Sequence, residues 1–543
     1  MGVPRTRSLR DVVLILLGAT SMHITSVFFG SFSDHFPGSV IVSTEVSSHI
    51  VSSADDSARL PDDDHERRGR IGLFGTPQVD VAYDFPETTI SSHAPGWTLF
   101  HNLYMSNGTL YIVSSQPSSA FPDIRLMTST GLPAENTPEN IAARIPTAEN
   151  MDFLTPAEAR SRWGGDSDRW ERNRVWSVEG NTFLYNDPQQ FLDHYYHFCA
   201  ELLFGAWAFW SGAWNAVVEP SASHLTTAPP VHRMIFANAG ADGWRDAPGF
   251  NAYFLRAAFP SLTVEVQEDW EDRIRATSAW GTHARAWHFD TVLFADRSAA
   301  FRGDICGLQT QRTASEAYEH MRQVGNLTKW WWEPVRRAIL RFAGIDAWVV
   351  DTGVRVEETA LAHVQAKQHD HDAGGDLTSP NSKQVGQDVV VTYISRQGTR
   401  RHLIESHHEA LVKALKETCA SHGWELSVVQ AERLSKEDQL EAVARSTILL
   451  GVHGNGLTHL IMMPVTPIST VIEIFYPEGF AHDYEWTTRA MGMKHFAVWN
   501  DTYRTYPDTP LPSYPEGFQG TQIPVYAPTV VKIIEDRVAG RLP

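Results

Sequence analysis

Residues 448–464 read ILLGVHGNGLTHLIMMP, and this stretch is the most informative about the fold of the C-terminal half of the chain. The apolar run 448–452 predicts a buried parallel strand. Glycines at positions 454 and 456 follow it and permit a tight turn that a ligand can approach closely. Helical spacing then resumes and ends near Pro464. A strand, a glycine turn and a helix together aim free backbone N–H groups at an anion. An ordinary tight turn between a strand and a helix is the alternative.

Strands and helices alternate on both sides of this stretch. The pattern predicts strands at residues 388–394, 425–429, 448–452, 471–475 and 495–498. The helices predicted between them cover residues 404–419, 436–445 and 484–491. Short links between strands and helices are typical of a doubly wound, Rossmann-like α/β sheet.

Polar residues and glycines follow several of these strands. In a doubly wound sheet, ligands bind beyond the carboxyl ends of the strands. The residues that this rule places there are Arg396, Arg400, Arg401, His453, Gly454, Asn455, Gly456 and Glu473. Arginines are often mere surface charge, but three of them at a ligand-facing edge favour an anion pocket. The sequence has no Walker loop and no G-x-G-x-x-G after its first predicted strand, which argues against a kinase or a dinucleotide oxidoreductase. We therefore expect a nucleotide diphosphate.

Composition separates this pocket from a nucleic-acid surface. The chain has 543 residues, 42% of them hydrophobic, and a formal net charge of −19. Such a length exceeds one core and favours two folded domains. The acidic balance argues against a nucleic-acid partner, because a phosphate backbone requires a basic surface.

The N-terminus carries a largely apolar stretch at residues 12–32, in which His23 is the one side chain that could be charged. As a helix it would span roughly 30 Å, about one hydrocarbon core. Three arginines precede it and an aspartate follows it, so the positive-inside rule places the bulk of the chain in a lumen. A cleaved signal peptide with its apolar region at residues 12–19 is the alternative. We favour a single-pass type II anchor because apolar residues continue to Phe32.

Three sequons agree with a lumenal address. They begin at Asn107, Asn326 and Asn500 and predict glycosylation in the secretory pathway. The chain has three cysteines, which permit one disulfide and one free thiol but do not form a disulfide scaffold. A Golgi or endoplasmic reticulum membrane, with the catalytic part lumenal, is the expected location.

The middle of the chain continues the α/β alternation. Strands are predicted at residues 108–113, 232–237, 262–266 and 291–295, and helices at residues 251–258 and 318–342. The Asp-x-Asp at residues 166–168 and the His- and Asp-rich segment 363–380 are interpreted as loops rather than as metal sites.

Residues 191–214 predict a long, mostly apolar helical segment. Its tryptophans recur at helical spacing, which is more typical of a core than of a sugar platform. His194, His197 and Glu201 share one face of this helix. Polar groups on a buried helix need partners. These side chains therefore either satisfy one another in the core or line a cleft.

Three segments resemble glycosyltransferase family 61. They read HYYHFCAELLFG at 194–205, TYISRQGTRRHL at 392–403, and GVHGNGLTHLIMMP at 451–464 followed by VIEIFYP at 471–477. The family includes plant xylan xylosyl- and arabinosyltransferases and animal O-linked N-acetylglucosaminyltransferases of the secretory pathway. The resemblance covers about residues 183–498. The usual form of the third segment is nearer GAHGAGLTN, so Asn455 and His459 are departures that bear on sugar specificity.

The resemblance implies a GT-B-like fold, with two Rossmann-like domains facing across a cleft, inversion at the anomeric carbon and a type II anchor. The expected order is a cytosolic tail (1–11), a transmembrane anchor (12–32), a disordered stem (33–72), an N-terminal acceptor-side domain (73–380), a C-terminal nucleotide-sugar-binding domain (381–500) and an extension that returns to the N-terminal domain (501–543).

The expected reaction moves a hexosyl or pentosyl unit from a nucleotide-sugar, expected to be a UDP-sugar, to a hydroxyl of a glycan or glycoprotein. The arginines and the glycine turn would neutralise the leaving diphosphate without requiring a metal or another cofactor. Glu473 would accept hydrogen bonds from ribose hydroxyls, or else is a buried carboxylate at a strand end. His197 or Glu201 is the candidate catalytic base.

Two other functions are compatible with the same residues. A metallohydrolase would bind zinc through His194, His197 and Glu201, although their spacing matches no familiar metal motif. A non-catalytic protein would bind a nucleotide or carbohydrate with the same fold and no chemistry.

Overall fold

The computed structural model describes residues 80–165, 171–216, 228–279, 281–324, 327–357, 389–520 and 522–543. They belong to one compact unit that runs from Gly69 to Pro543. The following predictions lie outside the described residues: the anchor at 12–32, the stem at 33–72, the sequon at Asn326, the Asp-x-Asp at 166–168 and the segment 363–380. Within the described ranges, no helix is long and apolar enough to cross a membrane.

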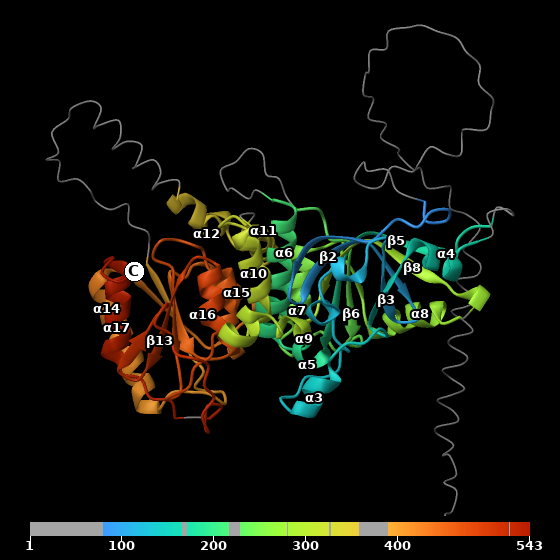
Figure 1. Ribbon diagram of the computed structural model, residues 1–543. Coiled ribbons are helices and arrows are strands. Elements are labelled where there is room, and N and C mark those ends of the chain that lie inside the picture. The colour runs from blue at the N-terminus through green and yellow to red at the C-terminus, as the bar shows by residue number, and fades with distance from the viewer. Residues whose placement is uncertain are drawn as a thin grey trace, which may run out of the picture. The chain divides into compact units, whose positions relative to one another are not determined.

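The first sheet has eight strands and mixed direction (Figure 1, blue to yellow-green). Its strands are β1 (Thr89–Ala94), β2 (Trp97–Ser106), β3 (Thr109–Val113), β4 (Met151–Leu154), β5 (Val175–Pro188), β6 (Arg233–Asn238), β7 (Thr263–Glu265) and β8 (Ala286–Ala295). The order is β4-β3-β2-β8-β5-β6-β7, with β1 paired to β2. Strands β8, β5, β6 and β7 run parallel, whereas β2 is antiparallel to β1, β3 and β8. The Rossmann-like expectation for this half therefore describes only the parallel part of the sheet.

Helices of this half follow or connect those strands. They are η1 (Ser118–Ala120), α2 (Ile124–Met127), α3 (Pro138–Ala143), α4 (Pro156–Trp163), α5 (Gln189–Leu192), η3 (Tyr196–Leu203), α6 (Phe204–Ala213), α7 (Phe250–Ala258), α8 (Gln267–Thr277), η4 (Gly281–His283), α9 (Arg297–Ala300), η5 (Asp304–Thr310), α10 (Thr313–Gln323), α11 (Glu333–Phe342) and α12 (Ala347–Val350). The predicted helix 318–342 is instead the two helices α10 and α11. Pro334 occupies the first turn of α11, where a missing N–H costs nothing.

The second sheet confirms the predicted alternation (Figure 1, orange to red). Its strands are β9 (Val390–Ile394), β10 (Glu425–Val429), β11 (Ile448–Val452), β12 (Thr470–Ile474), β13 (Lys494–Trp499) and β14 (Thr502–Arg504). The order is β10-β9-β11-β12-β13-β14, parallel except for the pair β13 and β14. Mixed α/β structure with two sheets fits a GT-B-like fold.

The helices of the second half are α14 (Glu405–His422), η6 (Ala431–Arg433), α15 (Lys436–Ala444), η7 (Asn455–Met462), α16 (Asp483–Ala490) and α17 (Ala527–Val538). The element after the glycine turn, η7, is a 3₁₀ helix rather than the expected α-helix. The hydrogen-bond geometry of a 3₁₀ helix is poorer than that of an α-helix. The dipole of η7 therefore supports anion binding less strongly than the dipole of the expected α-helix would.

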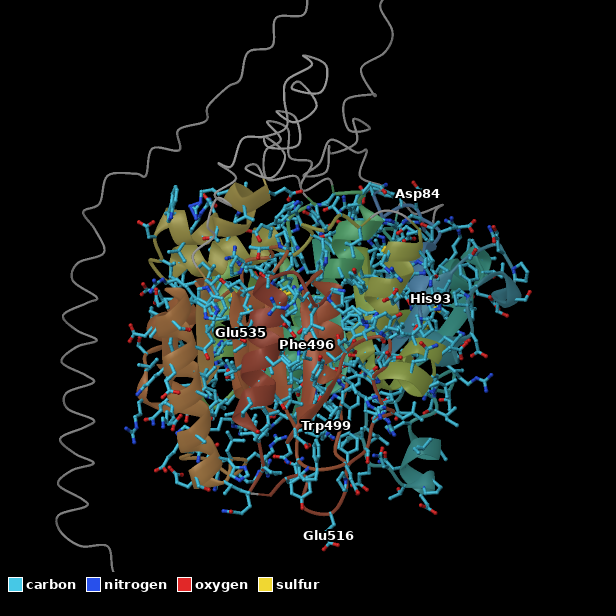
Figure 2. The ribbon with its side chains drawn as sticks, turned by 90° about the vertical axis from the view of Figure 1, so that its left-hand side faces the viewer. Asp84, His93, Phe496, Trp499, Glu516 and Glu535 are labelled. Atoms are coloured by element: carbon cyan, nitrogen blue, oxygen red, sulfur yellow. The ribbon has the colours of Figure 1, made fainter. Side chains whose placement is uncertain are left out.

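The C-terminal extension, which was expected to return to the N-terminal domain, has contacts in both halves of the chain. Helix α17 packs against α14, and Val530 and Ile533 join Leu411 and Leu415 in the core of the second sheet. Figure 2 shows this side of the molecule, with Phe496 and Trp499 labelled on β13 and Glu535 on α17. A connecting segment before α17 reaches the first half, where the Tyr514 hydroxyl donates to Oε1 of Gln311 over 3.4 Å.

One buried core extends through both halves along η7. The Trp332 indole N–H donates to the carbonyl of Ile461 over 2.9 Å, and Arg336 Nε donates to the carbonyl of Met462 over 2.9 Å. The backbone carbonyls at the end of η7 are thus satisfied by side chains of the first half. The three cysteines, all in described segments, are buried and unpaired.

Candidate active site

The second sheet changes winding direction between β9 and β11. Numbered along the chain from β9, its first five strands have the order 2-1-3-4-5, in which ligands bind at the switch point between the first and third strands. Arg396 follows β9, and the glycine turn follows β11, with Gly451 paired to Ile394. The topology therefore brings these two predicted donor-binding elements together at one edge.

Arg396 lies directly on the glycine turn. Its Nη1 donates to the carbonyl of His453 over 3.0 Å, and its Nε donates to the hydroxyl of Thr399 over 3.2 Å. Gly454 has φ 145° and ψ 179°, and a Cβ there would come within 1.6 Å of Arg396 Nη1. A side chain at this position would therefore displace the guanidinium, which explains the glycine.

Arg401 presents a guanidinium that lacks partners. Its Nε and Nη1 are buried and have no hydrogen bond within the described part of the chain. Burial, with Arg400 among its charged neighbours, lowers the pKa of Arg401, and burial together with Arg401 lowers the pKa of Arg396. Arg400 differs, because it is exposed and its Nη2 donates to Oε1 of Gln519 over 2.8 Å. Two partly buried cations that repel each other at a ligand-binding edge are suited to an anion.

Glu473 is buried between two histidines. Its Oε1 bonds to Nδ1 of His453, and its Oε2 lies 2.7 Å from Nε2 of His495. Burial raises the pKa of Glu473 and lowers the pKa of both imidazoles, that of His495 to about 4. With both oxygens engaged and no exposed surface, Glu473 does not fit the expected contact with ribose hydroxyls. Its position fits the alternative, a buried carboxylate near a strand end.

His453 braces the turn. Its ring stacks on Phe475 with centroids 5.2 Å apart, and its side chain is 9% exposed. The Nδ1 bond to Glu473 fixes the ring, while the His453 carbonyl receives Arg396. Within the turn, Asn455 and Gly456 are partly exposed and are therefore more accessible than His453 and Gly454, which are buried.

The two departures from the usual family motif make contacts between the halves. Oδ1 of Asn455 accepts from the backbone N–H of Tyr196 over 3.2 Å. Nδ1 of His459 lies 3.0 Å from the Tyr195 hydroxyl, and its Nε2 lies 3.0 Å from Oε1 of Gln439. Both side chains thus fasten η7 to η3, and His459 is buried in the shared core.

The first half contributes a charged cluster from the carboxyl end of its parallel strands. Glu201, on the π-helix η3, is 2% exposed and accepts from Arg297 Nη1 over 2.6 Å. Arg297 Nε also donates to Asp187 over 2.9 Å, so one guanidinium joins two carboxylates. Burial alone would raise the pKa of Glu201, but Arg297 and His197 outweigh burial and lower it to about 2. Glu201 is therefore an ionised group that substrate does not reach.

His197 has the geometry of an oriented base. Its Nδ1 lies 2.7 Å from Oε2 of Glu201, and its side chain is 31% exposed. A carboxylate that holds Nδ1–H leaves Nε2 as a free lone pair, as in a nucleophile–base–orienter arrangement. The predicted pair is thus brought together, with His197 accessible and Glu201 behind it.

The hydrogen bonds of Glu201 argue against the alternative in which this residue binds zinc. Oε2 of Glu201 already accepts from both Arg297 and His197, and Oε1 lies 3.4 Å from the backbone N–H of Thr313. Within the described segments, no group of three His, Cys, Asp or Glu side chains is placed to hold a metal ion. The ring of His194 lies 4.8 Å from that of His197, but the third ligand of the proposed set is committed to an arginine.

Asp483, at the start of α16, was missed by sequence reasoning. Its Oδ1 accepts from the Tyr196 hydroxyl over 3.1 Å and lies 3.5 Å from Arg312 Nη1. Burial raises the pKa of Asp483, while Arg312 opposes the rise. The signal available was its place at the head of a predicted helix after the fourth strand. Arg297 was missed too, although it follows the predicted strand 291–295 closely.

The predicted glycosylation sites that the structure describes are accessible. Asn107 and Asn500 are exposed and occupy turns, with φ 53° and φ 50° respectively. Asparagine tolerates this left-handed backbone better than most residues. Exposure is compatible with modification at either position.

Comparison with known proteins identifies the family to which these site elements belong. The profile of the Glycosyltransferase 61 family matches residues 195–472, which include η3, the Arg396 loop and the glycine turn. The chain is also 28% identical over 121 residues to the EGF domain-specific O-linked N-acetylglucosamine transferase of Drosophila melanogaster. That match covers 22% of this chain and 22% of the relative. With more than half of its length matched by the family profile, the chain belongs to the Glycosyltransferase 61 family.

Proposed function

We propose that the protein is an inverting glycosyltransferase that moves a sugar from a nucleotide-sugar, a UDP-sugar in our assignment, to a hydroxyl of a glycan or protein. The observation that supports it most is the partnerless guanidinium of Arg401 beside Arg396 at the switch point of the second sheet. Family membership supplies the reaction class.

The diphosphate of the donor binds at the edge formed by Arg396, Arg401 and the backbone of Gly454 to Gly456. Arginine recognises phosphate oxygens with paired N–H groups and stays charged even when partly buried. As the sugar departs, negative charge grows on the bridging phosphate oxygen. Fixed cations at that point stabilise the transition state without needing to reorganise.

His197 activates the acceptor. The acceptor hydroxyl gives its proton to Nε2 of His197 while its oxygen forms a bond to the anomeric carbon. The bond from that carbon to the phosphate oxygen breaks, and the nucleoside diphosphate leaves with the electron pair. Glu201, held by Arg297, keeps the imidazole in the tautomer with Nδ1 protonated and stabilises the imidazolium that forms.

The cellular setting follows from the N-terminal sequence. A type II anchor at residues 12–32 in a Golgi or endoplasmic reticulum membrane would place the sequons at Asn107, Asn326 and Asn500 in the lumen. Nucleotide-sugars and acceptor glycoproteins would meet the enzyme there. Proteolysis of intact and opened microsomes, read with an antibody to the C-terminus, tests this orientation.

A donor screen on the full chain tests the reaction. Thermal unfolding is measured with UDP and with a panel of UDP-sugars, and the best donor is then offered to glycan and protein acceptors. An N-acetylglucosamine donor and an EGF domain belong in the panel, because the Drosophila relative carries those words in its name. Stabilisation by one UDP-sugar and transfer with inversion support the proposal. A protein that binds no nucleotide-sugar, or binds one and transfers to no acceptor, contradicts it.

A further inference from the structure

Asp483 carries a carboxylate oxygen with no hydrogen bond in the described part of the chain. Its Oδ1 is held by Tyr196 and Arg312, whereas the contacts of the described residues leave Oδ2 free. The side chain is 29% exposed, in contrast to the 2% of Glu201. Of these two carboxylates, Asp483 is the one that a substrate can reach.

The first half of the chain fixes this carboxylate in place. Arg312 is completely buried, and its guanidinium lies 4.6 Å from the ring centroid of Tyr196, which bonds to Asp483. Arg312 Nη2 also donates to the carbonyl of Ala200 over 2.9 Å, and this hydrogen bond fixes the position of the guanidinium. Two fixed partners on one oxygen orient the other oxygen.

Tyr196, whose hydroxyl bonds to Asp483, contacts both functional groups of the proposed reaction. Its ring centroid lies 5.2 Å from that of His197 on the acceptor side, and its backbone N–H donates to Oδ1 of Asn455 in the glycine turn on the diphosphate side. In an inverting transfer, the leaving diphosphate and the attacking hydroxyl lie on opposite faces of the sugar. A carboxylate held by Tyr196 therefore borders the sugar itself.

We propose that Asp483 accepts hydrogen bonds from hydroxyls of the transferred sugar and restricts the donor to uncharged sugars. This assignment rests on the proposed function. A carboxylate bonds strongly to hydroxyl donors. The same carboxylate repels the carboxylate of a uronic acid, which is a repulsive contribution to specificity.

Calorimetry on the full-length Asp483→Asn variant tests the assignment, with UDP, the preferred UDP-sugar and UDP-glucuronic acid as ligands. UDP affinity should stay within about 2-fold, because Asp483 does not touch the diphosphate. Affinity for the preferred UDP-sugar should fall by about 10-fold or more, the loss of a charged hydrogen bond. The affinity for UDP-glucuronic acid should increase relative to the affinity for the preferred UDP-sugar. Asp438→Asn is the matched control, since Asp438 is an exposed aspartate in the first turn of α15.

The outcomes separate this inference from the proposed function. If the wild-type protein binds neither UDP nor a UDP-sugar, the proposed function fails. If it binds both and Asp483→Asn weakens UDP as much as the UDP-sugar, the sugar assignment is overturned alone. It is also overturned if turnover falls while both affinities hold, since Asp483 then acts on the acceptor. Tyr196→Phe serves as a second variant should Asp483→Asn fail to fold. It keeps the Asp483 carboxylate but removes one of the hydrogen bonds that orient it. Affinity for the UDP-sugar should then fall by a smaller factor than in Asp483→Asn, and UDP affinity should again be unchanged.

Discussion

Replacing Arg401 by methionine should stabilise the ligand-free protein and weaken its affinity for UDP. The guanidinium has two buried N–H groups without partners and is repelled by Arg396. Methionine fills a similar volume without a charge. A side chain whose removal helps the fold and harms binding is one retained for the ligand.

The size of both effects follows from hydrogen-bond energetics. An unmade hydrogen bond on a buried polar group costs about 1–3 kcal/mol, and Arg401 is only partly buried. We therefore expect its removal to raise the free energy of unfolding by about 1 kcal/mol. A charge-assisted contact to the diphosphate contributes about 1.5–3 kcal/mol, so the dissociation constant for UDP should rise by about 10- to 150-fold.

Arg396→Met should have the opposite effect on stability. This arginine donates to the carbonyl of His453 and to the hydroxyl of Thr399. Removing it should lower the free energy of unfolding by about 1–2 kcal/mol and also weaken UDP binding. Arg445→Met is the control, because Arg445 is exposed and pairs with Glu425.

Urea unfolding and isothermal titration with UDP on the full chain measure the two quantities. Arg401→Met should raise the free energy of unfolding and Arg396→Met should lower it, whereas both substitutions should weaken UDP binding. If Arg401→Met destabilises the protein as Arg396→Met does, its guanidinium has structural partners and the anion assignment is wrong. Unchanged UDP affinity in Arg401→Met would refute it equally.

Three further predictions test the first half of the site. His197→Ala should lower kcat by about 10²- to 10⁴-fold in initial-rate assays while UDP affinity is retained, because only proton transfer is lost. Arg297→Met should lower the free energy of unfolding in urea by about 3–5 kcal/mol, since it leaves buried carboxylates uncompensated. The pKa of Glu201 is lowered to about 2, so its stabilising contribution is present above about pH 4.5, is lost as the pH falls toward 2, and should shrink in this variant. Tyr195→Phe should cost about 1 kcal/mol in the same urea assay by leaving His459 Nδ1 unpaired.

The strands of the second sheet were predictable because of their environment. Parallel strands covered on both faces read as continuous apolar runs, and β11, buried along its whole length, occupies the predicted residues. The first sheet mixes directions, and its pairing of β2 with β8 joins residues far apart in sequence. No local pattern specifies such a pairing. Helix α17, which the sequence analysis did not predict, packs against α14 through tertiary contacts.

The residues of the candidate site also fall into a group that the sequence predicted and a group that it did not. The sequence predicted that Arg396 and the glycine turn lie at the same edge of the sheet, because strand topology alone brings them there. Asp483 joins Tyr196 across 287 positions and Arg312 across 171 positions, through side-chain contacts that periodicity does not encode. Residues recruited by tertiary packing are therefore those that sequence reasoning missed.

Two histidine–glutamate pairs flank the proposed site, and their chemistry differs although the residue types are the same. In each, Nδ1 of the imidazole bonds to a buried carboxylate, Glu473 for His453 and Glu201 for His197. What separates them is the other partner of the carboxylate. His495 shares Glu473 and burial disfavours charge on every member, whereas Arg297 holds Glu201 ionised behind an imidazole that is 31% exposed. A base must be accessible and must become an imidazolium that a fixed negative charge stabilises. His197 meets both requirements, whereas His453, 9% exposed with cationic Arg396 and Arg401 nearby, meets neither.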